Sequence, residues 1–153
     1  MDGFEWVHTE RRIRNQLDQV CERLSICNRW RAKRTDLARY YTLCMGLENK
    51  VRTNDKVIPL RDNEDPGSKL VEAVLHVEFQ IEHTGKHVLV FCTHGRSRSG
   101  AVVVGYLMRS RGWTYEQALG FARCKRPYIQ PCAEFEENLK LYFDPKEGDF
   151  AKK

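Results

Sequence analysis

Residues 86–106 read KHVLVFCTHGRSRSGAVVVGY and contain the feature around which the rest of the chain is organised. Val88 to Phe91 form an unbroken apolar run rich in β-branched and aromatic residues, which is typical of a strand buried on both faces. Cys92 ends this run, a polar and basic segment follows, and Ala101 to Met108 form a second apolar run of helical length. The stretch therefore predicts a strand, a short loop and the N-terminus of a helix.

The predicted loop suits the binding of an oxyanion. Such a loop directs several backbone N–H groups at one point, and the helix dipole adds partial positive charge there. Cys92 and Arg98 bracket five residues, a length that can curl with the thiol at its base and the guanidinium at its lip. The planar guanidinium can hold two phosphate oxygens at once. We therefore expect Arg98 to bind phosphate together with the loop residues Thr93, His94, Gly95, Arg96 and Ser97.

The cysteine at the base of this loop is a candidate nucleophile. A cysteine at a helix N-terminus beside cations favours its thiolate, which is the nucleophilic form of the side chain. Ser99 follows the arginine directly and could donate a hydrogen bond to the sulfur. That bond would ease the departure of the sulfur when a phosphocysteine intermediate breaks down. A packing cysteine, the alternative, needs no cationic loop.

The pattern Cys-x5-Arg-Ser, with Gly95 at the third position after the cysteine, resembles the signature loop of the cysteine-based protein phosphatases. Tyr106-Leu107-Met108 and Arg126-Pro127 resemble the dual-specificity branch of that superfamily. The resemblance runs from about residue 24 to residue 142 and is diffuse before residue 56. It implies a single phosphatase domain over residues 1–153 that uses no metal or other cofactor.

A general acid is the second requirement of this chemistry, because thiolate attack on a phosphate ester must expel an alkoxide or phenoxide. The acidic loop over residues 61–67 is the natural source. Asp62 lies thirty residues before Cys92 and resembles the general acid of the family. Asp62 is the first choice, Asp65 the second and Glu64 the third.

The chain departs from the family pattern at two positions beside the loop. Phe91 stands where a histidine usually precedes the nucleophile, which affects the expected activation of the thiol. Cys132 follows Pro131 where an asparagine is usual, so a supporting hydrogen bond is expected to be missing. A thiol at this position could also protect Cys92 as a disulfide, although an inert packing role is favoured.

The order of the predicted elements indicates an α/β fold with a central, mostly parallel sheet flanked by helices. Residues 9–24 have a helical repeat of apolar positions and predict an N-terminal helical extension over residues 1–24, whereas residues 145–153 predict a flexible tail. Thr114 with Gln117 is a capping-box pattern. Beyond the central strand, strands are expected over residues 24–27, 41–47 and 56–60, and helices over residues 33–40, 69–82 (capped by Ser68), 101–111, 115–125 and 134–143.

Composition limits the class of protein further. The chain has 153 residues, six cysteines without paired spacing and a formal net charge of +5. One domain in a reducing compartment, cytoplasmic or nuclear, is expected, without structural zinc. No apolar run approaches the ~20 residues of a membrane span, and the N-terminus lacks the apolar core of a signal peptide. We expect no membrane partner and no secretion.

Three functions fit these residues. The resemblance favours a phosphatase acting on phosphotyrosine and on phosphoserine or phosphothreonine, with a phosphorylated protein as partner and a protein kinase among the candidates. Cys92 to Gly95 also resembles the loop of RNA 5′-triphosphatases, although Ser99 and Asp62 argue against a nucleic-acid substrate. Arg96 leaves room for another polyanion such as an inositol phosphate. A weakly active phosphate-binding module is the third reading, favoured only by Phe91.

Overall fold

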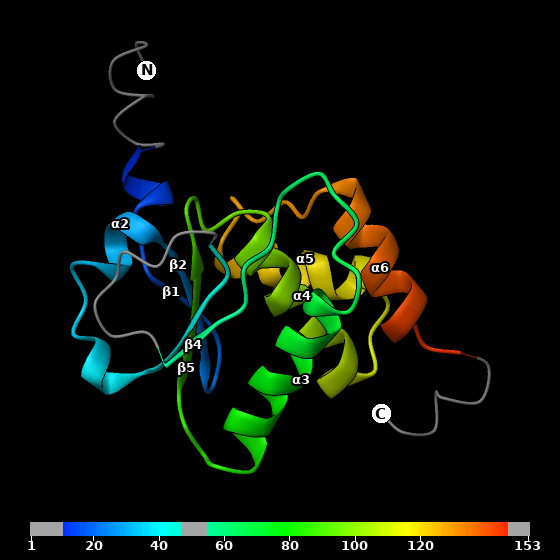
Figure 1. Ribbon diagram of the computed structural model, residues 1–153, viewed down its shortest axis with the longest axis horizontal. Coiled ribbons are helices and arrows are strands. Elements are labelled where there is room, and N and C mark those ends of the chain that lie inside the picture. The colour runs from blue at the N-terminus through cyan, green and yellow to red at the C-terminus, as the bar shows by residue number, and fades with distance from the viewer. Residues whose placement is uncertain (1–10, 47–54, 147–153) are drawn as a thin grey trace.

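The computed structural model describes residues 11–46 and 55–146, and its centre is a twisted sheet (Figure 1). Within these residues the sheet has five strands in the order β1-β2-β5-β3-β4. β5 pairs in parallel with β2 and with β3, β3 pairs in parallel with β4, and β1 is antiparallel to β2. The mostly parallel sheet with its central strand is therefore confirmed. The strands are β1 (Asp18–Cys21), β2 (Leu24–Asn28), β3 (Tyr41–Cys44), β4 (Lys56–Val57) and β5 (Val88–Cys92).

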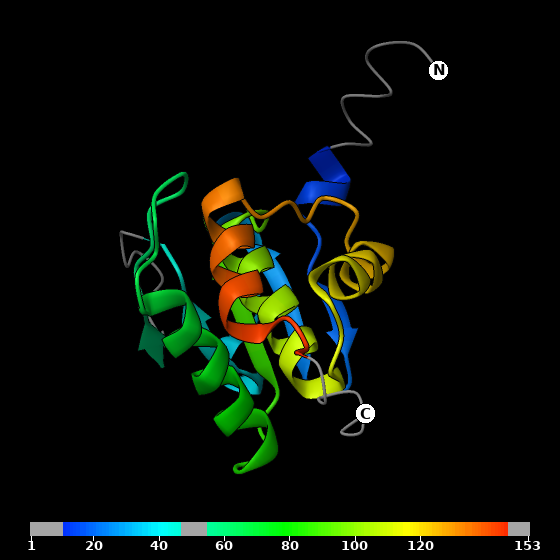
Figure 2. The same cartoon turned by 90° about the vertical axis from the view of Figure 1, so that its right-hand side faces the viewer.

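Helices cover the two faces of the sheet unequally (Figures 1 and 2). The larger layer comprises α3 (Lys69–Glu82), α4 (Arg98–Arg111), α5 (Tyr115–Lys125) and α6 (Ala133–Phe143). α4 contacts β2 and β5, α3 contacts β5, and α6 packs against α3 and α4. Of the described residues, the opposite face carries the short helix α2 (Arg29–Ala32) and the 3-10 turn η1 (Leu37–Arg39). α4 is thus the central helix of the larger layer, directly over the strand that leads into its own N-terminus.

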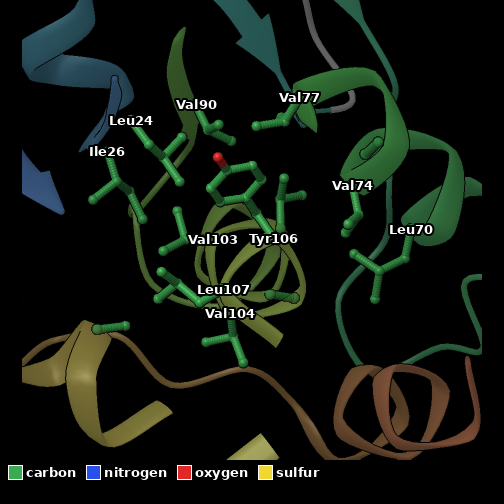
Figure 3. Packing of buried hydrophobic residues seen from close by; sticks show 14 of the residues in the cluster. Leu24, Ile26, Leu70, Val74, Val77, Val90, Val103, Val104, Tyr106 and Leu107 are labelled. Carbon is green, nitrogen blue, oxygen red and sulfur yellow. The ribbon is translucent and has the colours of Figure 1, made fainter. Parts of the chain in front are cut away.

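The side chains of β5 alternate between two apolar clusters, as the period of a strand requires. Val88, Val90 and Cys92 belong to the larger cluster under the helices, whereas Leu89 and Phe91 belong to the smaller one under α2 and η1. Figure 3 shows residues of α4 and α3 packed around Val90. Both faces of β5 are therefore apolar, which explains its unbroken hydrophobic run.

Several local predictions are confirmed. α3 spans residues 69–82 and α5 spans residues 115–125, as predicted. The Thr114 hydroxyl accepts from the Gln117 N–H at 3.2 Å, and the Gln117 amide oxygen accepts from the Thr114 N–H at 3.0 Å, which completes the capping box. α4 begins at Arg98, three residues earlier than predicted, and α6 begins one residue earlier, at Ala133.

The predicted helix over residues 9–24 is wrong in its second half. Residues 11–14 are helical, but β1 follows and pairs Asp18 with Ile26 and Gln19 with Ser25. The spacing of Val20 and Leu24 fits one helix face, yet the two residues lie on strands β1 and β2 and their side chains are buried there. Pairing with β2 satisfies the backbone N–H and C=O groups of this segment. The pairing depends on residues outside the local sequence window, so the local pattern does not predict it. Residues 1–10 of the predicted extension lie outside the described residues.

Other boundaries also differ from the predictions. The helix predicted over residues 33–40 is only η1, while α2 lies earlier and is capped by the Asn28 side chain, which accepts from the Arg31 N–H at 2.9 Å. The third strand ends at Cys44, and Leu47 lies outside the described residues. β4 ends at Val57, two residues before Pro59, which has no N–H to donate to a ladder. Ser68 makes no side-chain capping bond. Of the predicted tail, residues 147–153 lie outside the described range.

Candidate active site

The predicted loop lies at the carboxyl end of β5, where open α/β sheets place their sites. Cys92 is buried, with 2% of its surface exposed. Its Sγ accepts a hydrogen bond from the Gly95 N–H at 3.3 Å and lies 3.1 Å from the Ser99 hydroxyl. Arg98, also buried, begins α4. The loop therefore curls around the sulfur and brings the Ser99 hydroxyl beside it.

Gly95 is required where the loop turns. Its φ is +64°, in the left-handed region that side chains rarely adopt. A Cβ at this position would lie 2.8 Å from the Cys27 carbonyl group and 2.8 Å from an Arg126 nitrogen. Any larger residue would have to displace the main chain of β2, so the curled shape of the loop depends on this glycine.

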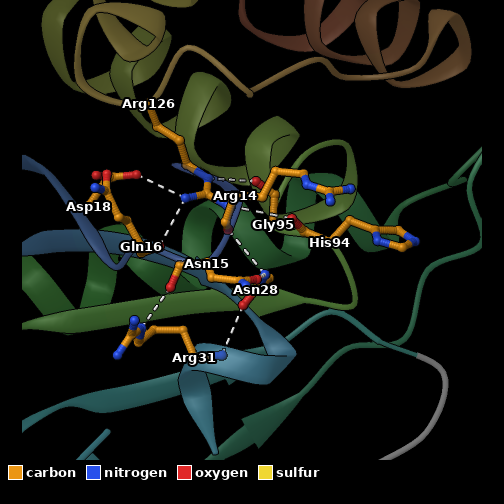
Figure 4. Close-up of polar contacts among 9 residues, drawn as sticks. All are labelled: Arg14, Asn15, Gln16, Asp18, Asn28, Arg31, His94, Gly95 and Arg126. Carbon is orange, nitrogen blue, oxygen red and sulfur yellow. Dashed lines mark hydrogen bonds and ion pairs between the residues drawn. The ribbon is translucent and has the colours of Figure 1, made fainter. Parts of the chain in front are cut away.

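Arg126 holds the loop from behind (Figure 4). Its side chain is fully buried and forms an ion pair with Asp18 at 2.8 Å. The guanidinium donates to the carbonyl oxygens of Gly95 at 2.8 Å and His94 at 3.5 Å. It also donates to the carbonyl oxygens of Arg14 at 2.8 Å and Gln16 at 2.9 Å, more than a hundred residues away in sequence. The sequence offered Arg126 only as part of a family resemblance, and no local pattern could reveal these partners.

An open cleft of about 490 Å³ lies above the sulfur. Cys92, Arg98 and Asp62 all line it. Asp62 Oδ2 is 3.7 Å from Arg98 Nε, and Asp62 Oδ1 is buried without a hydrogen-bond partner. Of the three acids considered, Asp65 instead accepts from the Gly67 N–H at 2.9 Å and lines a separate pocket, and Glu64 is exposed outside the cleft. Among these acids only Asp62 reaches the site.

The remaining predicted phosphate-binding residues lie on the rim. His94, Arg96 and Ser97 line the cleft, and the Arg96 guanidinium stacks on the Tyr128 ring at 5.2 Å. The Ser97 hydroxyl accepts from the Cys132 N–H at 3.0 Å. Thr93 is exposed and lines an adjoining cavity of about 370 Å³, which Cys92 and Arg98 also line. The structure thus brings the whole predicted loop around one centre, with Thr93 on its far side.

The two departures from the family pattern have different surroundings. Phe91 is buried in the smaller cluster, on the face of the sheet opposite to Cys92. Its strand partners are Cys27 and Cys44. Burial raises the pKa of both thiols, that of Cys27 to about 12, so they remain neutral. Cys132 is half-buried and lines the cleft.

The described residues contain neither a metal-binding cluster nor a membrane-spanning helix. Across residues 11–46 and 55–146, no group of three His, Cys, Asp or Glu side chains could hold a metal ion. In the same ranges, no helix is long and apolar enough to cross a bilayer. All six cysteines of the sequence fall within these ranges and are free thiols.

A thiol that accepts a backbone N–H and lies at a helix N-terminus, with an arginine and an aspartate on the same cleft, is arranged so that it can bind a phosphate and attack it with sulfur. Fold and site together define a cysteine-based phosphatase. The model of the family described as "Dual specificity phosphatase, catalytic domain" matches residues 13–144. The chain belongs to that family, and the resemblance found in its sequence is confirmed.

Individual relatives agree with this assignment. The chain is 38% identical over 87 residues to "Dual specificity protein phosphatase 1" of Arabidopsis thaliana, a match that spans 56% of this chain and 43% of that protein. Less than half the length of that relative is therefore covered. A mouse putative dual specificity phosphatase, solved in complex with zinc tungstate, superposes with a TM-score of 0.70 at 30% identity, over 84% of this chain and 87% of the other. Human DUSP28 superposes with a TM-score of 0.70 at 27% identity, over 83% and 92%.

Proposed function

We propose that this chain hydrolyses phosphotyrosine and phosphoserine or phosphothreonine in proteins, without a metal, through a phosphocysteine intermediate. The observation that carries the proposal is the position of Cys92 Sγ. It accepts from the Gly95 N–H at 3.3 Å, lies 3.1 Å from the Ser99 hydroxyl and faces a cleft that Asp62 also lines. A nucleophile, its stabilising donors and an acid thus share one centre.

In the first step the Cys92 thiolate attacks phosphorus. The S–P bond forms as the ester O–P bond breaks, and the leaving oxygen takes a proton from the Asp62 carboxyl group. Arg98 and the backbone N–H groups of the loop bind the non-bridging oxygens, where negative charge must be held throughout the reaction. The Nε–H of Arg98 is buried and makes no hydrogen bond to any part of the chain that the structure describes, so this donor is free to bind a phosphate oxygen.

In the second step water attacks the phosphocysteine. The Asp62 carboxylate, left unprotonated by the first step, accepts a proton from that water. A new O–P bond forms, the S–P bond breaks and inorganic phosphate leaves. The Ser99 hydroxyl, 3.1 Å from Sγ, donates a hydrogen bond to the departing thiolate. The free enzyme is then restored with no redox change and no co-reactant besides water.

The proposed breadth of substrates rests on the rim of the cleft. His94 and Arg96 are exposed, so the cleft is not enclosed on their side. Phosphorylated proteins are the proposed partners, with a protein kinase among the candidate substrates. The reactive thiolate requires a reducing compartment, and we propose the cytoplasm or the nucleus.

Turnover in the presence of a chelator tests the proposal. With EDTA and a thiol reductant, we expect the protein to release phosphate from an aryl phosphate and from peptides carrying phosphotyrosine or phosphothreonine. A triphosphate-ended RNA should be hydrolysed much more slowly. Inorganic phosphate is measured for each substrate at equal enzyme concentration. Faster release from the RNA, or dependence on added divalent metal, would contradict the proposed function.

The role of Asp62 predicts a dependence on the leaving group. Asp62→Asn keeps the size of the side chain but removes its proton, so turnover of an alkyl phosphate should fall about 10²- to 10⁴-fold. An aryl phosphate with an acidic leaving group should be affected much less, because its oxygen departs without protonation. Asp65→Asn is the matched control in the same loop. Equal losses for both substrates would remove the acid role from Asp62.

A further inference from the structure

We propose that Arg14 is a specificity residue that binds a second anionic group of the substrate, next to the scissile phosphate. The inference rests on the proposed phosphatase function and deepens it. Arg14 lines the same cleft as Cys92 and Arg98, although it comes from the segment before β1. Figure 4 shows its side chain and that of His94 extending to the same side, away from Asp18.

The main chain of Arg14 is tied to the catalytic loop. Its carbonyl oxygen accepts from Arg126 at 2.8 Å and from the Asn28 side chain at 3.1 Å. The same Arg126 guanidinium binds the carbonyl oxygens of His94 and Gly95 in the loop. One buried side chain therefore fixes both the loop and the backbone that carries Arg14. The backbone that carries Arg14 is held in place before any anion binds, so less conformational entropy is lost on binding than if this segment were mobile.

The side chain of Arg14 has an unused donor. Its Nε–H is buried and has no hydrogen-bond partner among residues 11–46 and 55–146. A buried donor without a partner is unfavourable, and a carboxylate or phosphate that approaches Nε and one terminal nitrogen side-on would satisfy it. Asp62, the acid that lines this cleft, lies beside Arg98 instead. Arg14 is thus left available for an anion from outside.

The cleft carries more positively charged side chains than the binding of a single phosphate requires. Arg14, Arg96 and Arg98 line it together with one carboxylate, Asp62. The scissile phosphate is held by Arg98 and the loop, and Arg96 is stacked on Tyr128 at the rim. A second negative group beside the first would find Arg14 on the neighbouring wall. In a phosphopeptide that group is either an acidic side chain or a second phosphate near the phosphorylated residue.

Three matched phosphotyrosine peptides test the assignment. They share one sequence, and the residue beside the phosphotyrosine is alanine, aspartate or phosphothreonine. We expect wild-type kcat/KM to be about tenfold or more higher for the two anionic peptides than for the alanine peptide. Arg14→Gln should lower kcat/KM mainly for the anionic peptides and so remove the preference. Arg14→Lys should keep part of it, because charge remains without the bidentate geometry. Arg12→Gln, at an exposed position of the same segment, should leave the preference intact.

The outcomes separate this inference from the proposed function. No release of phosphate from any of the three peptides would overturn the phosphatase function itself. Release without a preference in the wild type, or a preference that survives in Arg14→Gln, would overturn only the role of Arg14. Equal losses for all three peptides in Arg14→Gln would assign a structural role instead. A gain for phosphothreonine alone would identify the second phosphate as the group recognised, and equal gains would identify negative charge in general.

Discussion

Cys92→Ser should abolish phosphate release, with kcat lowered by at least about 10⁴-fold for aryl and peptide substrates alike. Serine keeps the shape of the side chain, but its hydroxyl is a far weaker nucleophile at neutral pH than a thiolate. The phosphate cradle remains, because Arg98 and the loop N–H groups are unchanged. The variant should therefore still bind a phosphopeptide while failing to turn it over, as measured by initial rates and by titration calorimetry.

The control for this variant is Cys124→Ser, which alters an exposed thiol on α5. It should retain wild-type kinetics. A second readout is the intermediate itself: rapid acid quench of the wild type with labelled substrate should trap label on Cys92, as located by peptide mapping. Residual turnover in Cys92→Ser within tenfold of the wild type, or label on another cysteine, would contradict nucleophilic attack by Cys92.

Arg126→Met should destabilise the fold by about 3–5 kcal/mol, because it removes one partner of a buried ion pair and leaves Asp18 uncompensated. The carbonyl oxygens of Arg14, Gln16, His94 and Gly95 also lose the hydrogen bonds that Arg126 donates to them. For a domain of this size the melting temperature should fall by about 6–20 °C. Calorimetry measures the shift. At a temperature where the variant is still folded, kcat/KM should fall about 10²-fold as the loop loses its support.

Two further variants show whether Arg126 acts through these contacts. Arg123→Met, on the exposed side of α5, removes a charge of the same kind and should change the melting temperature by no more than about 2 °C. Asp18→Asn combined with Arg126→Met forms a double-mutant cycle, and the double variant should be less destabilised than the sum of the two single variants. Additive losses would show that the ion pair contributes nothing beyond its separate members.

Much of the site could be predicted because its parts are close in sequence. The loop from Cys92 to Ser99 contains the candidate nucleophile, the arginine and the hydroxyl in one strand-to-helix turn, and the N–H of Gly95 meets the sulfur within that turn. The capping box at Thr114 and the boundaries of α3 are local in the same sense. For such features, residue types at fixed spacing determine which groups meet.

The helix predicted over residues 9–24 was wrong in its second half for the opposite reason. Val20 and Leu24 fit a helical repeat, but the backbone groups of Asp18 to Cys21 are hydrogen-bonded by pairing with β2. The Asp18 carboxylate also forms an ion pair with the buried Arg126 side chain. Neither contact is visible in a local window. Likewise, Asp62 could be ranked above Asp65 by resemblance, but its place on the cleft beside Arg98 is a matter of tertiary geometry.

By itself, the sequence determined the strand-to-helix loop around Cys92, its central buried strand and the α/β class, because hydrophobic period and residue spacing act over a few residues. Only the tertiary structure decided how the loop is supported and what surrounds it. Arg126 reaches carbonyl groups more than a hundred residues away, and Arg14 enters the cleft from the segment before β1. A buried guanidinium needs an acceptor for each of its N–H donors. Which acceptors lie within reach depends on the fold of the whole chain rather than on any one stretch of it.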